Sequence, residues 1–465
     1  MNAMTIQSSF SLPILFLLGT SVLVAQDDSE PAVASEPAIT AEIQKSHPAQ
    51  ATIGEALQQY GRGNAEQALK LLVAAHKSHP DLAPGEVIFA QLAFATNQPV
   101  AGRKALEMAA IHHADDPELW NILADLALRG GRLAESEVLF QHALQVAEGY
   151  SDNEARRAKQ SINAQAGLAS IYERRQQWTS AEEHLRKWID LAPKNSQAWQ
   201  RLAGVFFKTQ QYDIAEQTLV NLSSFDKAQP IPEVAMGLMY QQAGQHEKAE
   251  QAMRSALEKD AEGFTTQLSV ARWALSAGDQ ETLQNCAAKA KELNPESPAV
   301  DALLGMAQRF AGNPAQAEAI FSEMLDKNPA SFDATNGLAM ALLEQDDEPK
   351  HHKALQHAQM LVKSNPDQRT TRGRAAAATY AWALFRLNQS EAAAKVINSV
   401  ITSGEISPET SYFAAAIANQ NGEPQLAQEL LKGALSSHIA FAQKAAAEEL
   451  LFEISNQGPD SDKKD

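Results

Sequence analysis

The stretch that decides the fold is residues 161–195, SINAQAGLASIYERRQQWTSAEEHLRKWIDLAPKN. It contains two helical runs, with small Ala169 in the first and Ala181 in the second. A side chain with no atoms beyond Cβ lets two helices approach closely, and larger Leu185, one turn later, fills the groove beside that contact. Pro193 stops the second helix, because proline lacks the N–H that a helix interior needs. The stretch therefore predicts a pair of packed antiparallel helices.

The same unit recurs along most of the chain with a period of 34 residues. Small residues keep this spacing without a gap at Ala169, Ala203, Gly237, Ala271, Gly305 and Ala339, and the series also runs through Ala56, Ala90 and Ala124 and through Ala381 and Ala415. Turn formers separate the two helices of several units, as in Gly130-Gly131 and Gly312-Asn313. One helix pair cannot bury its own apolar face, so repeated pairs are expected to stack into a continuous core.

This pattern resembles the tetratricopeptide repeat (TPR) family in its period and in its residue types. The resemblance covers about residues 49–440 as eleven units, with Trp199, Tyr172 and Phe206 in register. It implies an all-α, right-handed α-α superhelical solenoid of about eleven helix pairs. The final helix, about residues 437–455, is expected to cap the last repeat, with 441–456 as its core span. About eleven extra residues after Ala143 are expected to lengthen two helices and their loop.

The two ends of the chain have a different character. Residues 10–24, FSLPILFLLGTSVLV, followed by Ala25, are typical of a secretory signal peptide, although no Lys or Arg precedes them. We therefore expect a signal peptide at 1–25 and an exported protein, periplasmic or extracellular, with an uncleaved membrane anchor as the alternative. Residues 26–48 and 457–465 are polar and are expected to be a disordered acidic leader and a disordered tail.

Composition narrows the range of functions. The chain has 465 residues and a formal net charge of −18, which disfavours binding to nucleic acid because phosphates would be repelled. A single cysteine, Cys286, excludes an intramolecular disulfide bond. No glycine-rich phosphate loop, paired-cysteine motif or His-Glu-x-x-His helix is present, and the repeats leave no room for a separate enzyme domain. We therefore expect no catalytic activity, no cofactor and no metal.

The inner surface of the resembled family is lined by the first helix of each pair, and peptides lie along it. Projecting that phase onto this chain predicts a basic row at Arg129, Arg174 and Lys208, extended by Arg272 and Arg309. Such a row could attract an acidic peptide. The alternative is that these cations simply lie at helix C-termini, where the helix dipole favours positive charge.

The same phase predicts an aromatic patch formed by Trp382, Phe385 and Tyr412. Aromatic side chains are frequent anchors of protein interfaces, and ordinary packing between repeats is the alternative. Together these features predict a non-catalytic, exported scaffold that holds a protein or peptide partner in the cell envelope. Two other hypotheses remain open: an accessory component of polysaccharide or lipid export, and a regulatory subunit of a separate enzyme.

Overall fold

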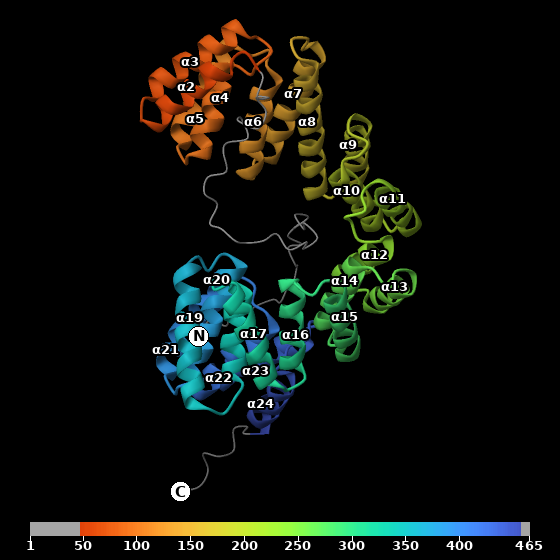
Figure 1. Ribbon diagram of the computed structural model, residues 1–465, viewed down its shortest axis with the longest axis vertical. Coiled ribbons are helices and arrows are strands. Elements are labelled where there is room, and N and C mark those ends of the chain that lie inside the picture. The colour runs from red at the N-terminus through yellow and green to blue at the C-terminus, as the bar shows by residue number, and fades with distance from the viewer. Residues whose placement is uncertain (1–46, 457–465) are drawn as a thin grey trace, which may run out of the picture. The chain divides into compact units, whose positions relative to one another are not determined.

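The computed structural model describes residues 47–456, and within this range all regular secondary structure is helical. The chain divides into two compact units, residues 47–232 and 233–456 (Figure 1). The expected signal peptide, most of the expected leader and the expected tail lie outside the described residues. No helix in the described part of the chain is long and apolar enough to cross a bilayer.

Helices follow one another in antiparallel pairs, as the 34-residue period predicts. The pairs of the first unit are α2 (Gln50–Gly61) with α3 (Ala65–Ser78), α4 (Gly85–Ala95) with α5 (Pro99–His112), α6 (Pro117–Arg129) with α7 (Leu133–Gly149), α8 (Glu154–Arg174) with α9 (Trp178–Leu191), and α10 (Ser196–Lys208) with α11 (Tyr212–Phe225).

The second unit continues the pattern and ends on an unpaired helix. Its helices are α12 (Pro232–Gln242), α13 (His246–Lys259), α14 (Phe264–Ala277), α15 (Gln280–Leu293), α16 (Pro298–Phe310), α17 (Pro314–Lys327), α18 (Phe332–Leu343), α19 (Glu348–Ser364), α20 (Thr371–Arg386), α21 (Ser390–Ser403), α22 (Pro408–Gln420), α23 (Pro424–Ser436) and α24 (Lys444–Asn456). The described residues thus contain eleven pairs and a terminal helix, which confirms the predicted fold class.

The small residues of the repeat lie where the two helices of a pair meet. Ala169 on α8, Ala203 on α10 and Ala181 on α9 are all fully buried. Where the small residue is glycine, a large side chain from the second helix fills the space. The ring of Phe321 on α17 lies against Gly305, which occupies this position on α16, and also against Gly337 on α18, two residues before the small position Ala339; the ring is itself 1% exposed. The predicted pairing of small and large residues is therefore the packing unit of the core.

Ten of the eleven turns inside the described pairs reverse the chain through one residue with a positive φ angle, and the turn between α18 and α19 is the exception. These residues share one phase of the repeat, and glycine predominates among them because it adopts the left-handed conformation without a steric penalty. They are Gly63, Asn97, Gly131, Gln176, Gln210, Gly244, Gly278, Gly312, Asn388 and Gly422.

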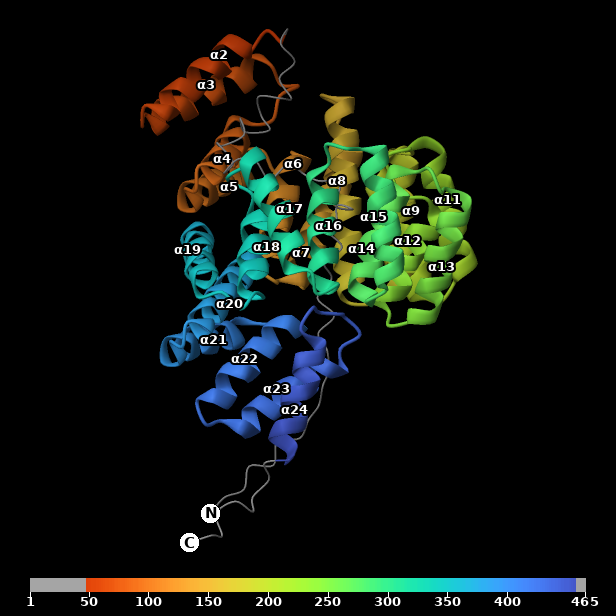
Figure 2. The same cartoon turned by 60° about the horizontal axis from the view of Figure 1, so that its bottom comes forward.

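Two features depart from the regular pair. The insertion after Ala143 lengthens α7 to 17 residues and α8 to 21 residues, as expected. The last helix begins later than predicted: α24 starts at Lys444, and residues 437–443 form a non-helical connection. Helices α22, α23 and α24 lie together at the end of the chain, shown in blue in Figure 2. Ala447, Leu450 and Leu451 of α24 pack on the core of the last pair, so the helix covers that core.

Candidate functional site

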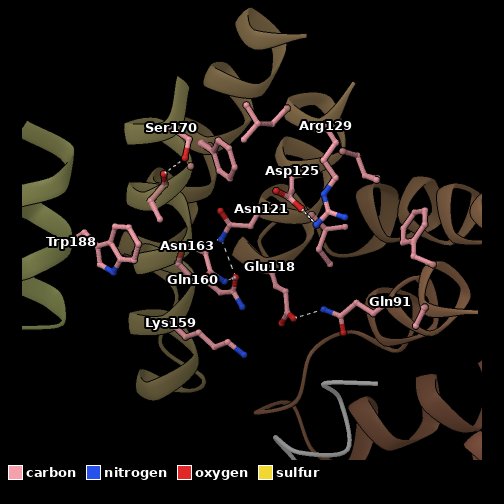
Figure 3. Close-up of a pocket in the computed structure, with 18 of the residues that line it drawn as sticks. Gln91, Glu118, Asn121, Asp125, Arg129, Lys159, Gln160, Asn163, Ser170 and Trp188 are labelled. Atoms are coloured by element: carbon pink, nitrogen blue, oxygen red, sulfur yellow. Dashed lines mark hydrogen bonds and ion pairs between the residues drawn. The ribbon is translucent and has the colours of Figure 1, made fainter. Parts of the chain in front are cut away.

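A groove of about 890 Å³ lies on the inner face of the first unit (Figure 3). Side chains from four successive first helices line it: α4, α6, α8 and α10. Its lining on α6 shows why the groove forms. Glu118, Asn121, Asp125 and Leu128 are spaced by three or four residues and so share one face of the helix. Buried Ala124 faces the second helix instead, so each first helix presents one face to its partner and another to the groove.

Amide side chains form much of the polar lining. Gln91, Asn121, Gln160, Asn163 and Gln197 come from all four first helices. Asn121 is 5% exposed, and its Nδ2 donates to both the backbone oxygen and the Oε1 of Gln160, each at 2.9 Å. The Oδ1 of Asn121 is buried and accepts no hydrogen bond within the described chain. This oxygen is an acceptor already placed at the groove wall.

The carboxylates at one end of the groove are neutralised by an arginine. Arg156 on α8 donates through Nη2 to Asp116 at 2.6 Å and to Glu118 at 2.8 Å, and all three side chains are nearly buried. Burial raises the pKa of Asp116, although the Arg156 guanidinium opposes that change. Gln91 Nε2 also donates to Glu118 Oε1 at 2.7 Å. Glu118 therefore contributes a bonded acceptor to the lining rather than an isolated charge.

A second buried ion pair lies on the α10 side. Arg201 on α10 is 7% exposed and binds Glu173 of α8 at 2.8 Å, and it also donates to Ser170 Oγ at 3.0 Å. The Trp188 ring lies 5.5 Å from the Arg201 guanidinium, and the buried Nε1 of Trp188 has no hydrogen-bond acceptor within residues 47–456. Since both ion pairs are satisfied internally, the groove offers chiefly amide groups and apolar surface. Lys159 also lines it, and desolvation lowers the pKa of its ammonium group.

The first three residues of the predicted basic row are exposed: Arg129, Arg174 and Lys208. Of these, only Arg129 lines the groove. Arg129 forms an ion pair with Asp125 one turn earlier, at 2.6 Å. Arg174 donates to the backbone oxygen of Leu128 at the end of the preceding first helix, at 3.3 Å. Lys208 at the end of α10 is exposed. The Arg174 contact therefore agrees with the alternative interpretation of this row, in which the cations interact with helix C-termini.

The last two residues of the row, Arg272 and Arg309, belong to the second unit and differ from the first three. Arg309 is buried, and its Nη2 binds Glu344 at 2.5 Å and Glu409 at 2.7 Å, so this residue is an internal tie between α16, α18 and α22 and not an exposed partner contact. Arg272 is half-buried, and burial lowers the pKa of its guanidinium. The prediction that Arg309 extends an exposed basic row is therefore wrong, because two carboxylates distant in the sequence bury it.

The predicted aromatic patch is assembled as a stack within the second unit. The ring of Trp382 lies between those of Phe385, at 5.0 Å, and Phe413, at 4.5 Å, with Tyr412 at 5.6 Å. Trp382 is only 5% exposed, while Phe385 and Tyr412 are half-buried. Trp382 is thus core in this structure, and an anchoring role for it would require the stack to open.

Sequence reasoning named only Arg129 among the residues that line the groove. The signal for the others was present in the phase of the repeat, because Asn121, Asn163 and Gln197 occupy inner-face positions of successive first helices. No group of His, Cys, Asp and Glu suited to holding a metal ion occurs within residues 47–456. The densest histidine group includes His351, whose Nε2 contacts the backbone oxygen of Gln345 at 2.7 Å.

Family models described as tetratricopeptide repeat match residues 89–153, 162–220, 234–262 and 303–369. The chain is a TPR protein. The matched segments fall in both units and coincide with the helix pairs described above.

Several solved structures resemble this protein at low sequence identity. A tetratricopeptide repeat protein from Parabacteroides merdae is 20% identical over 64% of this chain and 100% of its own, with a TM-score of 0.40. Yeast Tom70 is 14% identical over 88% of this chain and 96% of its own, with a TM-score of 0.38. Cut9–Hcn1 of the APC/C is 13% identical over 87% and 89%, with a TM-score of 0.40. Comparison with curated protein sequences gives no match.

Proposed function

We propose that this TPR protein is a non-catalytic scaffold that holds an extended segment of a partner protein in the groove of its first unit. The observation that carries the proposal is the row of amide side chains contributed by α4, α6, α8 and α10 to one open groove. An amide side chain offers both a donor and an acceptor, and an extended peptide exposes both kinds of group along its backbone. The row can therefore bind peptide backbone with little dependence on sequence.

Apolar side chains between the amides supply the complementary part of the binding energy. Phe94, Ile122 and Leu126 are half-buried at the groove wall, so a bound peptide would remove their remaining surface from water. The buried Oδ1 of Asn121 would gain a donor from the peptide, which removes the cost of an unpaired acceptor. Both effects favour a peptide that lies across the successive first helices rather than a compact small molecule.

We also propose that the protein is exported and acts in the cell envelope, as a periplasmic or extracellular component. Support comes from the apolar run at residues 10–24 ending at Ala25. N-terminal sequencing of the protein recovered from the envelope fraction tests this step. A mature N-terminus at Gln26 is expected, whereas recovery of uncleaved chain with the membranes would favour an anchored protein.

Site-specific photo-crosslinking in the native cells, followed by fractionation, tests whether the groove binds a partner protein. A crosslinking residue replaces Gln197, which is exposed and lines the groove on α10, and the matched control replaces Gln217, which is exposed on the second helix α11. We expect a discrete protein adduct from position 197 only, reduced several-fold when Asn163→Ala removes a neighbouring amide. Equal adducts from both positions would contradict the proposal. An adduct to glycan or lipid at 197 would instead favour an accessory role in export.

A further inference from the structure

The connection between α23 and α24, residues 437–443, lies against helices that are far earlier in the chain. The backbone N–H of Ala440 donates to the carbonyl oxygen of Ser276 at the end of α14, at 2.8 Å. The ring of His438 lies 4.1 Å from that of His246 at the start of α13. Both contacts are within the second unit, and both join its last repeat to its first ones.

Two further contacts fix the path of this connection. Gly278 occupies the left-handed turn after α14, and a Cβ built on it would lie 3.1 Å from the Cβ of Ala440, so the segment packs directly on the turn. Gln443 donates through Nε2 to Glu344 Oε1 at 2.7 Å. That carboxylate also binds the buried Arg309, which places Gln443 at the edge of an internal ion-pair cluster.

The surface that residues 437–443 cover has a counterpart in the first unit. Lys208, Ser276 and Glu344 share one phase of the 34-residue period, at the C-terminal ends of first helices. In the first unit the side chain of Lys208 at this position is exposed. In the second unit, the Ser276 carbonyl oxygen and the Glu344 carboxylate of this row accept hydrogen bonds from the chain's own C-terminal segment. One repeated surface is thus open in one unit and occupied by a peptide segment in the other.

The C-terminal arm, residues 437–456, is held by few buried groups. Phe441, at 7% exposed, and Ala447 are its buried hydrophobic residues, whereas Phe452 of α24 is 70% exposed. Segments with little buried apolar surface open locally at a smaller free energy than global unfolding. Helix α24 of the arm still packs Leu450 and Leu451 on the core of the last pair, so the weakly attached part is residues 437–443, which combine specific polar contacts with one buried hydrophobic residue, Phe441.

We propose that residues 437–443 are a resident peptide that occupies a peptide-binding row on the second unit and closes this row to partner segments until the arm leaves. The row consists of the Ser276 carbonyl, the Gly278 turn and the Glu344 carboxylate. It selects a bent, non-helical segment with a small residue against the Gly278 turn, an amide side chain three residues later and an aromatic ring two residues before that small residue. In the resident these are Ala440, Gln443 and His438. This proposal concerns a different unit and does not rest on the groove of the first unit.

The proposal is tested on the full chain with the variant Ala440→Pro. Proline has no N–H, so this variant cannot donate the hydrogen bond to the Ser276 carbonyl oxygen. Loss of this hydrogen bond should speed amide exchange across residues 437–447 by on the order of five-fold. A fluorescent peptide with the sequence of residues 435–446 should then bind this variant at least about ten-fold more tightly than it binds the wild-type protein. In the wild type the peptide must compete with residues 437–443 of the same chain, which are present at about millimolar effective concentration. Ile439→Ala is the control, because Ile439 lies in the same segment and is 56% exposed.

Each outcome decides between the alternatives. Unchanged exchange in Ala440→Pro would overturn the proposal, because the observed contacts would not be what holds the arm. Fast exchange without peptide binding would also overturn it and leave the segment as a structural tie only. If Ala440→Pro loses helical circular dichroism, the milder variant Gln443→Ala replaces it under the same criteria. A labelled peptide carrying Gln443→Ala should bind the opened protein several-fold more weakly, and equal binding would argue against the predicted recognition of Glu344.

Discussion

Replacing Gly337 with alanine should destabilise the second unit, although alanine is the better helix former. A Cβ on Gly337 would lie 2.4 Å from Cε1 of Phe321, far inside van der Waals contact. The ring has no free direction in which to move, because a Cβ on Gly305 would meet its other side at 2.5 Å. Overpacking of this kind costs about 1–3 kcal/mol. The gain in helix propensity, about 1 kcal/mol, offsets part of that cost.

A double-mutant cycle isolates the contact from the propensity effect. Phe321→Leu alone should cost about 1 kcal/mol, because it shrinks a buried side chain without removing its apolar character. In the Phe321→Leu background the added methyl group of Gly337→Ala has space, so the propensity gain should appear undiminished. The coupling free energy between the two substitutions is therefore expected to be at least about 1 kcal/mol in favour of the double variant.

Gly433→Ala provides the matched control in the same unit. Gly433 lies within α23, and no atom lies within 4 Å of its ideal Cβ position, so alanine there should raise the free energy of unfolding by up to about 1 kcal/mol. Urea unfolding followed by circular dichroism measures all variants, compared by midpoint at constant m-value. If Gly337→Ala stabilises the protein as much as Gly433→Ala, or if the cycle shows no coupling, Phe321 is not clamped between two helices and the packing argument fails.

Three further substitutions or modifications test other parts of the structure. Arg309→Ala should lower the free energy of unfolding by about 3–5 kcal/mol in urea titrations, because it removes the buried guanidinium that pairs with the partly buried carboxylates of Glu344 and Glu409; a loss below about 1 kcal/mol would contradict the buried tie. Burial raises the pKa of Cys286 to about 11, so alkylation by iodoacetamide at pH 8 should be much slower than for a free thiol and should become fast in urea. Tyr172, followed by Arg175, holds the pKa of Glu137 below its usual value of 4.5, so the stability that this carboxylate contributes is present above pH 4.5 and is lost as the pH falls through the lowered pKa. Tyr172→Phe should therefore reduce the melting temperature more at pH 7 than at pH 3, and equal reductions would argue against the Tyr172–Glu137 hydrogen bond.

The fold was predictable because its determinants repeat locally. Helix pairs, buried small residues such as Ala169 and Ala203, and glycine at the turns all follow from spacing within one unit of the sequence. The surroundings of Arg309 did not follow, because its partner Glu409 belongs to a helix three pairs later. Contacts of that range depend on the small rotation that each repeat adds to the next, and no single repeat encodes the accumulated curvature.

The same limit explains why the end of the chain was only partly predicted. Alanine-rich residues after Ser437 have good helix propensity, which favoured a helix from about that position. The structure keeps residues 437–443 non-helical instead, with bends at His438 and Ile439, the Ala440 N–H bonded to Ser276, and Gln443 bonded to Glu344. Tertiary hydrogen bonds thus replace the helical ones that these residues would otherwise form, and they became visible only once the repeats were placed in space.

One position of the repeat explains why the first unit has an open groove while the corresponding helix faces of the second unit are packed. The residue directly after the small position of the first helix is Gln91, Asp125 or Ser170 in three pairs of the first unit, and all three line the groove. In three pairs of the second unit it is Met306, Met340 or Trp382. These three large side chains pack in one hydrophobic cluster, which fills the inner face where the first unit leaves space. The size and polarity of this residue therefore distinguish inner faces that can receive a partner segment from inner faces that form core, and the distinction can be read from the sequence once the 34-residue register is known.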